Sequence, residues 1–297
     1  ITPIYWFFGY LTWYPLAAAI AILCIAGVCM IKTKIPFPTI HIQQIKAWRP
    51  TWKTLLLLLP IALLLLLILT LAKKMTGATI ISPWTLIGPK FWLLTAVSVP
   101  AVFFVLQQKT SATYQYIILA LWYLLVYGFL LFTHKYAFGF DQHIHLASMN
   151  WIVTHGLLEP KVPYYLGQYF TSISLAEITN LSLDWISRAL VPAAAAIILP
   201  LILLQKKDLS PTIALLPLLP LSFLTFTTPN NLALLIALLT VLTVWVRFDT
   251  RTIGTHIFIG ILTIWALITH VLIGLPLVCV LLLIYSKHTW QTVLASA

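Results

Sequence analysis

The sequence predicts an all-α protein, a polytopic bundle of about nine transmembrane helices with one long external loop. The chain is 61% hydrophobic and 8% charged, with a mean hydropathy of +1.02, whereas a soluble domain carries roughly 25% charged residues. Apolar runs of about 20 residues, the length that crosses a bilayer as a helix, recur along the chain. Basic residues lie unevenly at alternate ends of these runs, as in proteins that cross a membrane repeatedly.

The apolar runs give the predicted spans in order. Most are bounded by prolines, basic residues or turn-rich segments, which set their ends to within a few residues. The last two are short and meet at Thr269 and His270, so one long, bent helix is an alternative to two helices. The predicted spans are 6–31, 54–72, 91–107, 113–133, 185–204, 210–227, 231–246, 253–269 and 271–286.

The distribution of charge predicts the orientation. Eleven of the seventeen Lys and Arg residues fall on one side of the predicted membrane, and four of the six acids fall on the other. The side rich in Lys and Arg is cytoplasmic by the positive-inside rule. The N-terminus and the loop 134–184 are therefore predicted outside the cytoplasm, in a plasma or inner membrane. The net charge of +11 then reflects topology, and nucleic acid is excluded as a partner.

We divide the chain into two parts. Residues 1–112 form an N-terminal extension of three spans with a basic cytoplasmic loop at 32–53. Residues 113–297 form the transmembrane core that carries the loop 134–184. The chain stops at Ala297 where a helix is beginning, so we expect the core to be truncated at its C-terminal end.

The loop 134–184 holds the scarce polar chemistry of the chain, with four of the six acids and four of the eight histidines. Loops of about fifty residues are usually functional or disordered, and this one is too aromatic for disorder. We predict amphipathic juxtamembrane helices here, the first running from Asp141 to about Thr154 and ended by Gly156.

Asp141 and His145 are four residues apart on that helix and share a face, whereas His143 points the opposite way. Such a pair can be a base with its orienting partner, or two ligands of one cation. The alternative is a capping aspartate beside interfacial histidines.

Two tyrosines and a glutamine, Tyr164, Tyr165 and Gln168, supply hydroxyl and amide groups that suit a sugar or a headgroup. An aromatic belt is the alternative. Arg188 lies four residues after Asp184, which predicts a local ion pair at the start of a helix.

The loop resembles the start of the GT-C superfamily of membrane glycosyltransferases. A transmembrane helix ends in Gly139-Phe140-Asp141, and a Tyr-Tyr-x-Gly-Gln-Tyr turn and a span opening with Ser187-Arg188 follow. The resemblance is to the broad group that includes the lipid A and cell-wall glycosyltransferases and the protein mannosyltransferases. It implies transfer of a sugar from a polyprenyl-phosphate carrier to an acceptor on the outer face of the membrane, within the region 113–286.

The resemblance places the acceptor-activating base, or a ligand of a metal or of the carrier, at Asp141. His145 is its helper by geometry. His143, Tyr164, Tyr165 and Gln168 are predicted to bind substrate, with Lys135, Lys161 and Arg188 as candidates for the carrier phosphate. A divalent cation is left open, with Asp141 and His145 as its ligands if there is one. Partners are the membrane lipid and the polyprenyl-phosphate sugar.

Three other functions compete with this one. The first is a non-catalytic subunit or scaffold of a larger membrane complex. The second is a transporter, which usually carries ionisable residues at mid-bilayer, whereas the charges here lie at span ends. The third is a metal-dependent hydrolase using His143, His145 and Asp141, although the chain has no HExxH motif.

Overall fold

The computed structural model describes residues 52–78, 83–108, 110–156, 165–205, 212–219, 221–247 and 253–296. The predicted first span at 6–31 and almost all of the basic loop 32–53 lie outside these residues, as do Lys161 and Tyr164. Within the described part of the chain every secondary-structure element is a helix. The one β-type pairing there is an isolated bridge between Thr76 and His134.

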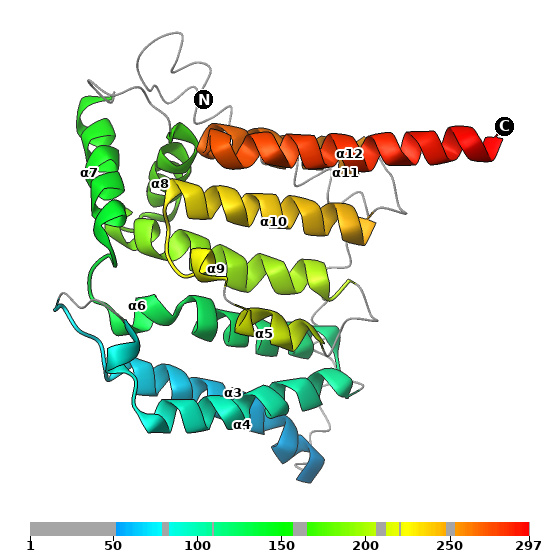
Figure 1. The fold of residues 1–297 in the computed structure, drawn as a ribbon. Helices are drawn as coiled ribbons and strands as arrows, with labels where there is room; N and C mark the ends of the chain where they lie inside the picture. The colour runs from blue at the N-terminus through cyan, green and yellow to red at the C-terminus, as the bar shows by residue number, and fades with distance from the viewer. Residues whose placement is uncertain are drawn as a thin grey trace. The chain divides into compact units, whose positions relative to one another are not determined.

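Ten α-helices and three 3-10 helices are described (Figure 1). The α-helices are α3 (Trp52–Ala72), α4 (Pro89–Gln107), α5 (Ala112–Tyr127), α6 (Phe129–Thr133), α7 (Phe140–His155), α8 (Leu166–Thr179), α9 (Leu183–Leu203), α10 (Pro229–Arg247), α11 (Ile253–Thr269) and α12 (Val271–Ser296). The 3-10 helices are η2 (Pro83–Leu86), η4 (Thr212–Leu218) and η5 (Ser222–Leu224).

Three of these helices are long and apolar enough to cross a membrane: α4, α9 and the Pro229–Val246 part of α10. Four further apolar stretches are shorter: Leu57–Ala72, α5, α11 and Val271–Ser286. The all-α class is confirmed for the described residues, and their apolar helices are compatible with a membrane. A count of nine spans stays a prediction.

The prediction of a span at 210–227 is wrong. This region contains the two short 3-10 helices η4 and η5 instead of one α-helix. Pro211, Pro217 and Pro220 explain the difference, because each lacks the N–H that a continuous helix requires and its ring clashes with the preceding turn. The predicted span 113–133 is likewise interrupted, with α5 ending and α6 starting around Gly128. The two-helix interpretation of 253–286 is confirmed, since α11 ends at Thr269 and α12 begins at Val271.

The chain forms two compact units. Unit 2 comprises residues 34–143 and 184–227, and within it α3, α4, α5, α6 and η4 pack together. Trp122 and Tyr123 of α5 are fully buried there, and their side chains tether η4 by donating to the carbonyls of Ala214 and Ile213, each at 2.9 Å.

Unit 1 comprises residues 1–33, 144–183 and 228–297, of which the described part contains most of α7 together with α8, α10, α11 and α12. A buried cluster joins α7 to α8, and α11 packs against α8, α10 and α12. The cluster consists of Met149, Ile152, Leu166, Tyr169, Phe170 and Ile173. The predicted division of the chain at residue 112 stays a prediction.

Candidate functional site

The helix predicted from Asp141 is α7, and glycines in the left-handed region stand at both of its ends. Gly139 has a φ of +84° and Gly156 a φ of +74°, values that residues with a Cβ rarely adopt. Gly156 ends the helix as predicted. The helix begins at Phe140, so Asp141 lies inside the first turn and is not the residue before it. Its exposed carboxylate still sits at the positive end of the helix dipole.

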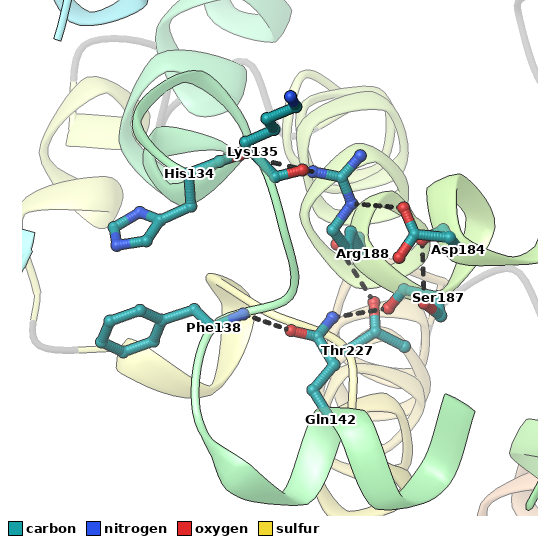
Figure 2. Close-up of polar contacts among 8 residues, drawn as sticks. All are labelled: His134, Lys135, Phe138, Gln142, Asp184, Ser187, Arg188 and Thr227. Atoms are coloured by element: carbon teal, nitrogen blue, oxygen red, sulfur yellow. Dashed lines mark hydrogen bonds and ion pairs between the residues drawn. The ribbon is translucent and has the colours of Figure 1, made fainter. Parts of the chain in front are cut away.

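Arg188 of α9 fixes the backbone that follows α6 (Figure 2). Its Nη1 donates to the carbonyl of Lys135 at 2.8 Å and to that of His134 at 3.3 Å. Its Nε lies 3.2 Å from Oδ2 of Asp184, which confirms the predicted ion pair between these two residues. Most of the guanidinium is thus engaged within unit 2, and its role at a carrier phosphate stays a prediction.

Gln142 makes a second set of hydrogen bonds in the same unit, which no sequence pattern predicted. Its Oε1 accepts from the N–H of Phe138 at 3.0 Å, and its Nε2 donates to the carbonyl of Ser187 at 2.8 Å. Both ends of this buried amide are therefore satisfied, and Figure 2 shows it linking the segment before α7 to α9. A glutamine in the first turn of a helix is too common a feature to have predicted this role.

Two hollows of unit 2 are lined by residues of this segment. A cavity of about 570 Å³ is bordered by His134, Tyr136, Phe138, His143 and the segment Thr76–Ala78. A second hollow of about 520 Å³ is an apolar groove between α4, α5, α6 and the 3-10 helices. Phe138 lines both of them. Of the predicted site residues, His143 borders the cavity with an exposed side chain.

In unit 1 the structure brings two predicted residues, His145 and Tyr165, together with Tyr169 and His270. The Nδ1 of His145 lies 2.9 Å from the hydroxyl of Tyr169. The ring of Tyr165 meets His145 edge-on at 5.3 Å and stacks on His270 at 5.6 Å. Burial raises the pKa of Tyr169 to about 12, so its phenol stays protonated at neutral pH and can donate to His145.

Gln168 of α8, a predicted substrate ligand, is fully buried, and neither atom of its amide has a hydrogen-bond partner within the described residues. The hydroxyls of Ser172 and Thr269 are buried and unpartnered in the same way. Thr171, by contrast, donates to a carbonyl of its own helix at 2.6 Å, the usual arrangement for a helical hydroxyl. Unpaired polar groups of this kind cost stability, which keeps Gln168 a candidate for binding.

We expect Gln168→Leu to raise the free energy of unfolding by about 1–3 kcal/mol, because it removes the desolvation cost of an unpaired amide. Chemical unfolding in detergent micelles measures this. Gln142→Leu is the matched control, since that buried amide is fully bonded and its loss should destabilise the protein. Equal destabilisation by both substitutions would show that the Gln168 amide is paired in solution.

The sequence left open whether Asp141 and His145 bind a divalent cation. Within the ranges that the structure describes, no three His, Cys, Asp or Glu side chains gather as a metal-binding set. No model of a known protein family matches the chain, and no curated protein or solved structure matches it significantly.

Proposed function

We propose that this chain is a membrane glycosyltransferase that moves a sugar from a polyprenyl-phosphate carrier to an acceptor on the outer face of the membrane. The observation that carries the proposal is that unit 2 has an apolar groove and, beside it, a cavity bordered by two histidines, with Phe138 lining both. A polyprenyl-phosphate sugar has the same division, with a long hydrocarbon tail on one side of a phosphate and a hydroxyl-rich ring on the other.

The groove suits a prenyl chain by shape. Its walls include Phe91, Trp122, Phe129 and Leu130, with few polar groups among them. In a bilayer the tail leaves lipid that is as apolar as the groove, so little hydrophobic free energy is gained by the transfer. The groove therefore acts mainly by positioning the tail, and selectivity arises at the phosphate and the sugar.

Lys135 is well placed for the phosphate. Its ammonium is on an exposed side chain, 5.6 Å from the ring centre of Tyr136, and the residues on either side of it border the cavity. A lysine is a flexible point charge and suits a phosphate that arrives and leaves. Lys161 and Arg188 remain the other candidates.

Asp141 supplies the base in this proposal. It takes the proton of the acceptor hydroxyl while that oxygen forms a bond to the anomeric carbon of the sugar. The bond from that carbon to the phosphate oxygen breaks, and its electron pair leaves with the polyprenyl phosphate. His145, which the sequence predicts as a helper, lies 2.9 Å from the Tyr169 hydroxyl in unit 1 and takes no part in this step. A single displacement of this kind inverts the configuration at the sugar. No step requires a cation.

The first test concerns the groove. We expect Thr95→Trp to weaken binding of polyprenyl phosphate at least tenfold, because Thr95 lines the groove and an indole there would fill it. Binding is measured by native mass spectrometry of the full chain in lipid nanodiscs. Leu93→Trp is the matched control on the same helix, since Leu93 is 68% exposed and does not line the groove.

A non-catalytic subunit of a membrane complex gives a different result. In that case both α4 variants bind polyprenyl phosphate as weakly as the unmodified chain does, and neither changes the binding of bulk lipid. That outcome would overturn the proposed function.

A further inference from the structure

Hydrogen bonds from three segments hold the backbone around His134, beside the cavity. The N–H of His134 donates to the carbonyl of Leu130 at 3.0 Å, and its own carbonyl accepts from Arg188. Next to it, the carbonyl of Thr133 accepts from the N–H of Thr76 at 2.9 Å. Groups from α6, α9 and the segment after α3 thus fix the backbone of one histidine, as the supporting groups of a functional side chain do.

Thr133 fixes the proton on the imidazole. Its hydroxyl donates its single hydrogen to the carbonyl of Phe129 at 3.0 Å. The same oxygen lies 2.9 Å from Nδ1 of His134, where it can therefore only accept. With the Thr133 hydrogen on the Phe129 carbonyl, Nδ1 carries the proton of the neutral ring and Nε2 is left with its lone pair.

Nε2 is itself buried, and it has no hydrogen-bond partner among the residues that the structure describes. The ring is 6% exposed, meets Phe138 edge-on at 4.9 Å and borders the cavity. In Figure 2 it lies on the side away from the guanidinium of Arg188. Burial lowers the pKa of His134 below its ordinary value, because the charged form is poorly solvated. The ring is therefore a neutral acceptor at pH 7.

A bare nitrogen acceptor selects the chemistry of what it binds. Phosphate oxygens are acceptors themselves and are repelled by it. A metal ion needs further ligands, and no set of three side chains suited to a metal gathers within the described ranges. Hydroxyl groups donate, and the sugar is the hydroxyl-rich part of the donor substrate.

We propose that Nε2 of His134 accepts a hydrogen bond from a hydroxyl of the donor sugar, which makes this cavity the sugar pocket and His134 a specificity-determining residue. The inference rests on the proposed function, because that function supplies the sugar. It adds the part of the substrate that the cavity takes and the atom that recognises it.

The test compares polyprenyl phosphate with the same lipid esterified to glucose, galactose or mannose, each bound to the full chain in nanodiscs at pH 8. We expect the unmodified chain to prefer one glycosylated lipid by about tenfold, the range of one hydrogen bond to a buried acceptor. His134→Phe should remove that preference and leave binding of the lipid without sugar unchanged. His155→Phe, at an exposed histidine of α7 that does not border the cavity, should change neither.

A pH series gives a second readout that does not depend on folding of the phenylalanine variant. Protonation removes the lone pair, so the preference should fall as the pH drops through the lowered pKa of His134. The other titratable groups that border the cavity are His143 and Tyr136, and Lys135 and the Arg188–Asp184 pair adjoin the backbone of His134. The His134→Gln variant keeps an acceptor oxygen at this position but has no side chain there that titrates. Its preference for one glycosylated lipid should therefore persist at low pH. Any pH effect that remains in this variant measures the titration of the lipids and of the neighbouring groups.

The outcomes separate the two proposals. A folded His134→Phe variant that keeps the preference, or a preference in the unmodified chain that is the same at every pH, overturns the inference. Equal binding of all four lipids by the unmodified chain also overturns the inference about His134, but it leaves the proposal that the groove binds the lipid tail unaffected. Failure of the unmodified chain to bind any of them overturns the proposed function itself.

Discussion

Asp141→Asn is expected to lower the rate of sugar transfer by two to four orders of magnitude, the usual contribution of a positioned general base. The amide keeps the size of the side chain but cannot take the acceptor's proton. Asp141 is exposed in the first turn of α7, so the fold should lose at most about 1 kcal/mol from the helix dipole. The measurement is release of polyprenyl phosphate from the glycosylated lipid that the chain prefers, with a membrane extract as the source of acceptor.

Glu177→Gln is the matched control for charge. Glu177 is an exposed acid on α8, outside the proposed chemistry, and its removal should leave the rate unchanged. If Asp141→Asn transfers sugar as fast as Glu177→Gln, Asp141 is not the base. If neither variant nor the unmodified chain transfers sugar, the non-catalytic subunit becomes the better account.

Gly274→Val is expected to destabilise unit 1 by about 3 kcal/mol or more, at the upper end of the cost of overpacking. A Cβ on Gly274 of α12 would lie 2.6 Å from the backbone nitrogen of Leu267 in α11. Backbone atoms of a neighbouring helix cannot rotate away as a side chain can, so the two helices must separate. Thermal unfolding in detergent, followed by the loss of helical circular dichroism, measures the effect.

Gly260→Ala on α11 is the control with the opposite sign. Nothing lies within 4 Å of the position that its Cβ would take. Alanine is a better helix former than glycine by about 0.8–1.0 kcal/mol, so this variant should be slightly more stable than the unmodified chain. Similar melting temperatures for the two variants would mean that α11 and α12 do not pack as closely as described.

Local patterns were sufficient to predict the three longest apolar spans. The predicted spans at 91–107, 185–204 and 231–246 correspond to α4, α9 and α10 with ends that differ by at most two residues. Each is a continuous apolar run with a proline or an acid at its start. The prediction failed at 210–227 because it rested on hydropathy alone. Three prolines in this segment lack the N–H groups that a continuous α-helix requires, and 3-10 helices form instead.

The candidate site was predictable only where its contacts are short in sequence. Asp184 and Arg188 are four residues apart, and their ion pair followed from helical spacing. The contact of Arg188 with the carbonyl of Lys135 joins residues 53 positions apart, and no local rule anticipates it. His134 was one of four histidines in the loop, and its burial beside the cavity, with Nδ1 bonded to Thr133, distinguishes it from the exposed His143 that borders the same cavity.

The central claim is that the groove and the cavity of unit 2 together hold a lipid-linked sugar. The most direct test is a cryo-electron microscopy map of the full chain in nanodiscs with the polyprenyl-phosphate sugar that it binds best. We predict continuous tail density along the groove and ring-shaped density in the cavity within hydrogen-bonding distance of His134. Bulk lipid or a second protein copy in the groove, with the sugar bound elsewhere, would contradict the account.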